Sequence, residues 1–242
     1  VSVRRRLLER VLASGTDHFT AVSRSIRDHI SRDWGVAEDR VTFIPNGVDP
    51  ELFENMPSKA EARKILGLPA DASLVITVGR LSPEKGQDVL LEAVAAIQDR
   101  SVQAVLVGDG PMRASLESRA KQPDLSGRVH FLGLRKDVPT CLAAADLYVL
   151  PSRYEAQGMV VVEAMMAGLH IVDSRVGGVP GILEDGVTGI LVPPADPAVL
   201  AEAIRLRPNP EMASRARRET LAALTVDTMV ESYLKLYREL SA

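Results

Sequence analysis

The sequence has little cysteine, almost no net charge and no long apolar run. Cys141 is the only cysteine among 242 residues, so no disulfide can form within the chain, and we expect a reducing, cytoplasmic location. The formal net charge of −3 gives no reason to expect a nucleic-acid partner. No apolar run approaches the ~18 residues of a membrane span. An anionic ligand would therefore need a local binding site.

The start of the chain, "VSVRRRLLERVLA", is basic and amphipathic, without the apolar segment typical of a signal peptide. Its arginines, Arg4–Arg6, leave two interpretations open. They form either a weak peripheral contact with anionic lipid at the inner face of the membrane or a solvated helix face.

Strand-like and helix-like segments alternate from about residue 74. The β-branched run "SLVITVG" precedes "GQDVLLEAVAAIQ", which has helical spacing. The same order recurs in "VQAVLVGDG" and "MRASLESRAKQ", and in "DLYVLPS" and "GMVVVEAMMAG". This alternation predicts an α/β fold with a doubly wound, Rossmann-like parallel sheet and helices on both faces. In such sheets ligands bind beyond the carboxyl ends of the strands.

Two segments flank the predicted sheet domain. Residues 1–40 are expected to be lead-in helices, and the turn-rich "IPNGVD" follows at 44–49. Residues 226–240 carry an apolar stripe that predicts an amphipathic helix. We therefore divide the chain into the lead-in, a domain at 41–222 and a C-terminal helix at 223–242.

The loop "VGRLSPEKG" is the first candidate site. Gly79 lets the backbone turn after a strand, and Arg80 and Lys85 follow at the start of the next helix. Two cations beside a helix N-terminus suit a phosphate group. An ordinary solvated loop with surface charges is the alternative.

The loop "LVGDGPMR" is a second glycine-containing turn at a strand end. It has neither the three-glycine spacing of a dinucleotide site nor a Walker phosphate loop. The backbone around Gly108 is the better candidate for a ligand contact. Asp109 is expected to cap the helix that follows Pro111.

The stretch "YEAQGMVVVEAMMAG" places Glu155 in a loop and Glu163 in an apolar run. Three consecutive valines favour a strand, but the helix formers after them and Gly168 favour a helix that begins near Gly158. The N-terminal amides of that helix would attract an anion. Carboxylates beside them would accept hydrogen bonds from hydroxyl groups, or serve only as a cap and an ion pair.

Metal coordination has no support in the sequence. The four histidines are scattered, and no closely spaced carboxylate pair suggests a divalent cation. His130 and His170 lie in predicted strands and are expected to be packed rather than catalytic. No metal and no cofactor are expected.

Together these motifs resemble the C-terminal, donor-binding half of the retaining "group 1" glycosyltransferases of the GT-B fold. The resemblance extends from about Thr20 to the C-terminus and includes "AVSRSIRDHI", "IPNGVDPELF", "VHFLG" and "GGVPGILEDGVTGILVPPAD". It implies metal-independent transfer of a hexosyl group from a UDP-, GDP- or ADP-linked sugar to a hydroxyl, with retention of configuration.

The resemblance also implies roles for individual residues. Arg80 and Lys85 would hold the diphosphate and stabilise it as it leaves. Glu155 would bind the hydroxyls of the donor sugar and Glu163 those of the ribose. The remaining donor-binding residues implied are Gly79, Gly108, Leu132 beside the base, and Gly158, Met159 and Val160.

A complete member of the family carries a further Rossmann-like domain that holds the acceptor, and residues 1–40 resemble only its tail. The resemblance therefore implies a missing acceptor-binding domain or a separate partner chain, and no transfer by this chain alone. The alternative is a non-catalytic nucleotide-binding module that works with a partner. Self-association through the C-terminal helix is also expected.

Four positions depart from the family pattern. Ala156 and Gln157 stand where Gly-Phe is usual, His170 where Pro is usual, and Gly181 where an acidic residue is frequent. The first two leave the identity of the donor sugar open.

Overall fold

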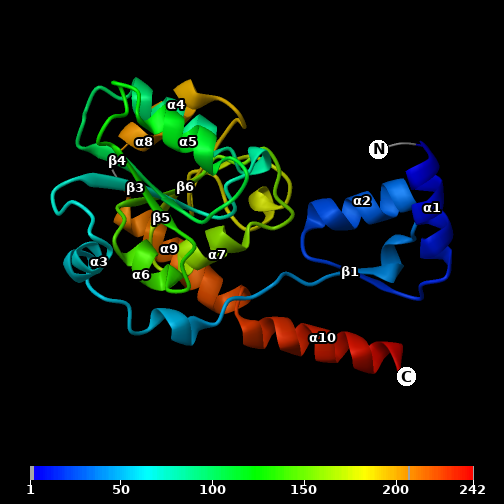
Figure 1. Ribbon diagram of the computed structural model, residues 1–242. Coiled ribbons are helices and arrows are strands. Elements are labelled where there is room, and N and C mark those ends of the chain that lie inside the picture. The colour runs from blue at the N-terminus through cyan, green and yellow to red at the C-terminus, as the bar shows by residue number, and fades with distance from the viewer. Residues whose placement is uncertain (1–2, 207, 242) are drawn as a thin grey trace.

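A six-stranded parallel sheet forms the centre of the molecule in the computed structural model, which describes residues 3–206 and 208–241 and the side chains from residue 8 (Figure 1). The strand order is β5-β4-β3-β6-β7-β8. The strands are β3 (Ser73–Val78), β4 (Val102–Val107), β5 (Val129–Gly133), β6 (Leu147–Leu150), β7 (His170–Ser174) and β8 (Ile190–Val192).

This order confirms the predicted doubly wound sheet. The first strand of the sheet, β3, lies in the middle, the next two lie on one side and the last three on the other. The direction of winding therefore reverses between β3 and β6, which pair directly through Val75 with Leu147 and Ile76 with Tyr148. A doubly wound sheet binds its ligand at the carboxyl ends of the strands on either side of this reversal.

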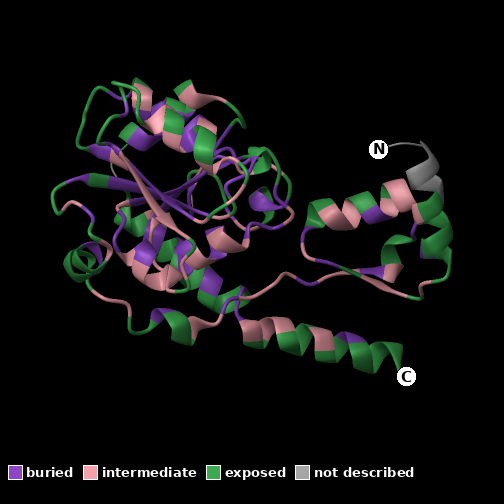
Figure 2. Ribbon diagram, in the orientation of Figure 1, coloured by how far each residue is buried: buried purple, intermediate pink, exposed green. Residues whose placement is uncertain are grey.

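Helices cover both faces, because successive strand residues point to opposite sides. Leu74 and Ile76 of β3 belong to one core cluster, and Val75 belongs to the other. The first face is covered by α3 (Lys59–Leu66), α6 (Val138–Ala143), α7 (Met159–Met166) and α9 (Pro210–Ala223). The second is covered by α4 (Gln87–Ala96), α5 (Arg113–Ala120) and α8 (Pro197–Arg205). Buried residues accordingly line the strands in Figure 2.

The valine run of "GMVVVEAMMAG" is helical, as its C-terminal half predicts. Helix α7 begins after Gly158 and ends at Met166, and Gly168 follows in the left-handed region at φ 75°. Val161 and Val162 are buried on the helix instead of in the sheet. Tertiary packing thus overrides the β preference of the three valines.

The lead-in is a separate small unit (Figure 1). Helices α1 (Val3–Ser14) and α2 (Arg24–Trp34) pack on a two-stranded parallel sheet. Strand β1 (Phe19–Ala21) pairs with β2 (Val41–Phe43). These strands of three residues differ from the expectation of helices alone, since they are too short to show an alternating pattern. Strand β2 also lies beyond the boundary expected at residue 40; the division of the chain remains a proposal, with 44–49 as the linker.

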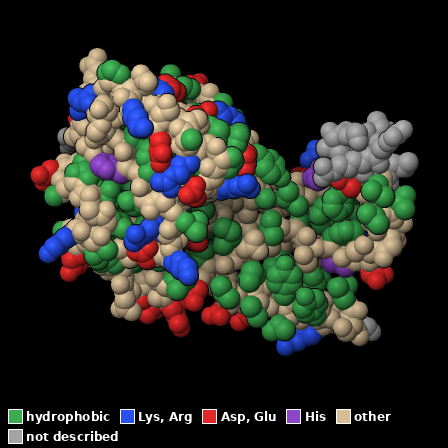
Figure 3. Space-filling model, viewed as in Figure 1, with side chains coloured by type: hydrophobic (Ala, Val, Ile, Leu, Met, Phe, Trp, Pro, Cys, Tyr) green, Lys and Arg blue, Asp and Glu red, His purple; other side chains and the backbone are tan. Residues whose placement is uncertain are grey.

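Helix α10 (Val226–Leu240) has the bounds predicted for the amphipathic helix. It leaves the large domain and extends below the lead-in unit (Figure 1). Its exposed apolar side chains are Val230, Leu234, Tyr237 and Leu240, and hydrophobic side chains gather over this region in Figure 3. Self-association through this surface remains a prediction.

Within the described part of the chain, four short 3₁₀ turns complete the secondary structure: Glu38–Arg40, Pro50–Phe53, Pro83–Lys85 and Val179–Gly181. Among the residues that the structure describes, no helix is long and apolar enough to cross a membrane. Arg4–Arg6 lie on α1, but their side chains fall outside the described part, so lipid contact stays untested.

Candidate functional site

Two loops meet at the reversal point of the sheet, one after β3 and one after β6. The backbone N–H of Arg153 donates to Glu84 O at 2.8 Å. Its guanidinium donates to Pro83 O at 2.7 Å and forms an ion pair with Asp88 at 2.7 Å. The hydrogen bond from Arg153 lowers the pKa of Asp88. The two loops are therefore held together at the carboxyl ends of β3 and β6.

Lys85 and Glu155, predicted from separate motifs, lie in contact in this crevice. Lys85 Nζ donates to Glu155 Oε1 at 2.5 Å, and Ser152 Oγ donates to the same oxygen at 2.8 Å. The Glu155 side chain is 7% exposed and that of Lys85 is 22% exposed. The lysine charge and the serine hydroxyl thus offset the cost of burying the carboxylate. No pattern in the sequence identified Ser152.

Gly79 and Gly108 bring the ends of β3 and β4 together. A Cβ atom on Gly108 would lie 2.0 Å from Gly79 O, so only glycine fits there. A cavity of about 390 Å³ opens beside them and is also lined by Arg80 and Arg135. Arg80 is exposed, and its guanidinium makes no ion pair with the described residues. It is available to an anion in this cavity.

Asp109 does not cap the following helix, contrary to prediction. That helix, α5, begins at Arg113 without a side-chain cap. Asp109 instead accepts a hydrogen bond from Gly110 N at 2.7 Å and pairs with Arg113 Nη1 at 3.1 Å. The turn around Pro111 separates the carboxylate from the first helical amides.

The N-terminus of α7 lies at the same edge of the sheet. Gly158 has no side chain with which to cap it, so the first amides, those of Met159 and Val160, have no partner within the helix. Glu163 is half-buried one turn further along, and burial raises its pKa. Among the described residues no group donates a hydrogen bond to its carboxylate.

Leu132, expected beside a nucleotide base, lies on β5 and packs against the large core while remaining partly exposed. Its neighbour His130 forms a hydrogen bond with Gln103 at 2.7 Å, and burial lowers the pKa of His130. His130 is packed, as predicted. Within the described residues, no group of three or more His, Cys, Asp or Glu side chains could hold a metal ion.

Asp173, near the carboxyl end of β7, was missed by the sequence reasoning. It is fully buried, and neither carboxylate oxygen has a hydrogen-bond partner among the described residues. Desolvation, and next the charge of Glu155, raise its pKa well above the usual value, while Lys85 lowers it. Asp173 therefore lies close enough to Lys85 and Glu155 for both charges to affect its pKa. An acidic residue inside the apolar strand "HIVDS" was the available signal.

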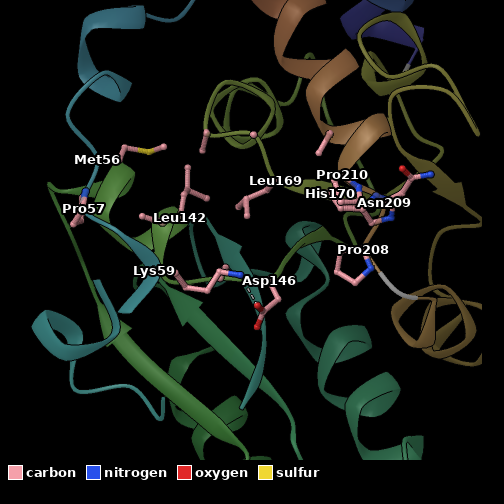
Figure 4. A pocket seen from close by; sticks show the side chains of 15 residues that line it. Met56, Pro57, Lys59, Leu142, Asp146, Leu169, His170, Pro208, Asn209 and Pro210 are labelled. Atoms are coloured by element: carbon pink, nitrogen blue, oxygen red, sulfur yellow. Dashed lines mark hydrogen bonds and ion pairs between the residues drawn. The ribbon is translucent and has the colours of Figure 1, made fainter. Parts of the chain in front are cut away.

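A second cavity, of about 320 Å³, lies at the opposite edge of the sheet, before β6 and β7 (Figure 4). Asp146 pairs with Lys59 there at 2.7 Å. His170 also lines it and is 3% exposed; neither ring nitrogen has a partner among the described residues. Burial lowers the pKa of His170, which fits the packed role predicted for it. None of the predicted donor-binding residues lines this cavity.

Comparison with known proteins identifies the family to which the chain is similar. The profile of the family described as "Glycosyl transferases group 1" matches residues 58–219, and that of "Glycosyltransferase Family 4" matches residues 1–52. The chain is 35% identical over 232 residues to the D-inositol 3-phosphate glycosyltransferase of Saccharomonospora viridis, covering 89% of this chain and 54% of that protein. It is 36% identical over 191 residues to the alpha-D-kanosaminyltransferase of Streptomyces kanamyceticus, covering 75% and 49%.

Solved structures share the fold. The structure of Anabaena HepE in complex with UDP and glucose has a TM-score of 0.90 and 29% identity, over 99% of this chain and 68% of that one. Sucrose-phosphate synthase from Thermosynechococcus elongatus has a TM-score of 0.86 and 30% identity, over 99% and 62%. The chain spans about half the length of the curated relatives it matches.

Proposed function

Because the chain belongs to the group 1 glycosyltransferases, we propose that its crevice between β3 and β6 binds the nucleotide-sugar donor of a retaining hexosyl transfer. The observation that carries this proposal is the contact of Lys85 Nζ with Glu155 Oε1 at the reversal point. A cation and a hydroxyl-binding carboxylate lie side by side there, as a donor with a diphosphate next to a sugar requires.

Three groups bind the diphosphate in this proposal: Lys85, Arg80 and the first amides of α7. Lys85 approaches from the loop after β3, and Arg80 lies at the cavity beside Gly79 and Gly108. The amides at the start of α7 add the partial positive charge of a helix N-terminus. These groups hold the diphosphate and stabilise the charge that develops when the bond between it and the anomeric carbon breaks.

The two glutamates bind hydroxyl groups. Glu155 takes the hydroxyls of the donor sugar, and Glu163 takes those of the ribose, because no described residue donates a hydrogen bond to its carboxylate. Leu132 lies beside the base. The structural neighbour HepE was solved with UDP and with UDP-glucose, which favours uridine as the nucleoside here.

The acceptor site belongs to a further domain or partner chain in this proposal. The relatives are about twice as long as the part that this chain matches, and α10 presents apolar side chains beside the lead-in unit. We propose that the reaction uses no metal and takes place in the cytoplasm.

Titration calorimetry with UDP, GDP and ADP tests the donor site. Wild type is expected to bind UDP most tightly. Lys85→Ala removes a charge-assisted contact and should weaken binding by roughly 1.5–3 kcal/mol. Lys121→Ala, at an exposed position at the C-terminal end of α5, is the matched control and should bind as wild type does. Equal affinity of wild type and Lys85→Ala would show that the assigned role is wrong.

A further inference from the structure

We propose that Gln157 is a positioning residue that couples the donor loop, residues 152–158, to the linker, residues 44–49. This inference rests on the donor site proposed above. Gln157 is 3% exposed. Its Oε1 accepts a hydrogen bond from Asn46 N at 2.9 Å, and its Nε2 donates to Asn46 O at 2.9 Å. One buried amide therefore binds both backbone groups of a single linker residue.

The linker is held by backbone hydrogen bonds on both sides of Asn46. Ile44 N donates to Ala21 O of the lead-in at 2.9 Å. Val48 N donates to Leu224 O at 2.9 Å, just before α10. Alternate linker residues are thus bonded in turn to the lead-in, the donor loop and the segment that begins α10. A Cβ atom on Gly47 would lie 2.0 Å from Thr225 O, so the linker backbone packs closely against the start of α10 and only glycine fits there.

The donor loop is fixed at its other end by the site itself. Glu155 is bonded to Lys85 and Ser152 through its side chain, and its carbonyl oxygen accepts from Gly178 N at 3.1 Å. Gln157 stands between Glu155, which would contact the sugar, and Gly158, where α7 begins. A diphosphate that binds the α7 amides restrains Gly158, and it therefore restrains the backbone that carries the Gln157 amide.

Bonding at both amide atoms makes this contact sensitive to position. A shift of the loop relative to the linker strains both hydrogen bonds, because they join the same two residues. Among the described residues, Gln157 is the one partner of Asn46 N and O. An apolar side chain of equal length would fill the same space without this requirement. The coupling must be reciprocal, since a ligand that steadies Asn46 is itself bound more tightly when Asn46 is held.

Hydrogen exchange at the Asn46 amide, followed by NMR in the 242-residue chain, tests the coupling. Saturating UDP should slow this exchange in wild type. Gln157→Met keeps the side-chain length and removes both bonds, so exchange at Asn46 should become about tenfold faster and should no longer respond to UDP. The affinity of Gln157→Met for UDP should be lower than that of wild type. The expected factor is the one by which UDP slows exchange at the Asn46 amide in wild type. Gln122→Met, on an exposed glutamine, should change none of these.

The outcomes separate this inference from the donor site. If calorimetry finds no UDP binding by wild type, the proposed function fails and the coupling fails with it. If UDP binds but leaves Asn46 exchange unchanged, or if Gln157→Met still responds, the coupling alone is overturned. Gln157→Glu keeps the acceptor for Asn46 N but replaces the donor to Asn46 O by an acceptor, so exchange at Asn46 should also be faster than in wild type. The wild-type measurement and Gln157→Glu decide the question if Gln157→Met does not fold.

Discussion

Lys85 Nζ lies 2.5 Å from Glu155 Oε1, across two loops that are 70 residues apart in the sequence. Both side chains are largely buried, so water cannot fully solvate either charge when its partner is removed. A diphosphate that approaches Lys85 competes with Glu155 for the ammonium protons. A sugar hydroxyl that approaches Glu155 donates a hydrogen bond in place of the one that Lys85 withdraws. The pair therefore favours a ligand that carries both a diphosphate and a sugar.

Glu155→Gln should separate recognition of the sugar from recognition of the nucleotide. Glutamine keeps the size of the side chain but removes the charge-assisted hydrogen bonds to sugar hydroxyls, worth roughly 1.5–3 kcal/mol. We expect UDP-glucose to lose affinity relative to UDP by that amount. UDP itself should bind as tightly as before or more tightly, because Lys85 is no longer neutralised. Calorimetry with both ligands measures the difference.

Glu184→Gln, on an exposed loop, is the control for that comparison. A parallel loss of UDP and UDP-glucose affinity in Glu155→Gln would contradict contact between Glu155 and the sugar.

Glu163 should discriminate ribose from 2′-deoxyribose. Glu163→Ala is expected to weaken UDP much more than 2′-deoxy-UDP, because the deoxy ligand has already lost one partner hydroxyl. Only the ionised carboxylate accepts fully from a hydroxyl, and burial raises the pKa of Glu163. The preference of wild type for UDP should therefore weaken as the pH falls, beginning at a higher pH than for an exposed glutamate.

The ratio of the two dissociation constants at each pH is the quantity to measure, because it cancels ionisation of the phosphates. Glu163→Gln should give a ratio that does not vary with pH. Equal losses for both nucleotides in Glu163→Ala would indicate a structural role.

Asp173 should lower stability near neutral pH. Its pKa is raised in the folded state, chiefly by desolvation, so the folded protein binds more protons than the unfolded chain at a pH between the two pKa values. The contribution of Asp173 to the free energy of unfolding must then fall as the pH rises from about 4. Asp173→Asn does not titrate, so its stability relative to wild type should increase by up to about 1.4 kcal/mol per pH unit.

Urea unfolding of both proteins from pH 4 to pH 7 tests this slope. Asp71→Asn, at an exposed position, should follow wild type throughout. A difference between Asp173→Asn and wild type that stays constant with pH would show that Asp173 does not titrate anomalously.

The sequence predicted the sheet because its strands are long runs of apolar residues bounded by glycines. "SLVITVG" and "VQAVLVG" became β3 and β4 at nearly those positions. The strands β1 and β2 escaped prediction, since three residues cannot establish an alternation and their pairing joins Phe19 to Val41. Local patterns identify elements, but pairing between distant short segments depends on tertiary contacts.

The candidate site shows the same division. Lys85 and Glu155 were identified by residue type and by position at strand ends, and the parallel topology brought them together. Ser152, Asp173 and the Gln157–Asn46 contact were not, because each depends on which side chain is buried against which loop. Burial and partnership are properties of the fold. Of these residues, only Asp173 had a signal in the sequence, as an acidic residue within an apolar strand.

The chain alone is expected to bind a nucleotide-sugar donor and to transfer no sugar. Transfer requires an acceptor oxygen held close to the anomeric carbon, and positioning of that kind supplies ~7–11 kcal/mol of barrier reduction. The contacts proposed here, those of Arg80, Lys85, Glu155 and Glu163, all serve the donor. In the chain alone, water also screens the crevice, which weakens the attraction between the cations and the leaving diphosphate. Slow hydrolysis of the donor is the most that this arrangement should support.

The measurement is incubation of the purified chain with labelled UDP-, GDP- and ADP-sugars and a broad acceptor mixture, with and without a Rossmann-like domain supplied as a separate chain. Lys85→Ala serves as the control for hydrolysis that depends on the donor site. Robust transfer by the chain alone would place the acceptor site within these 242 residues, and the requirement for a further domain would be wrong.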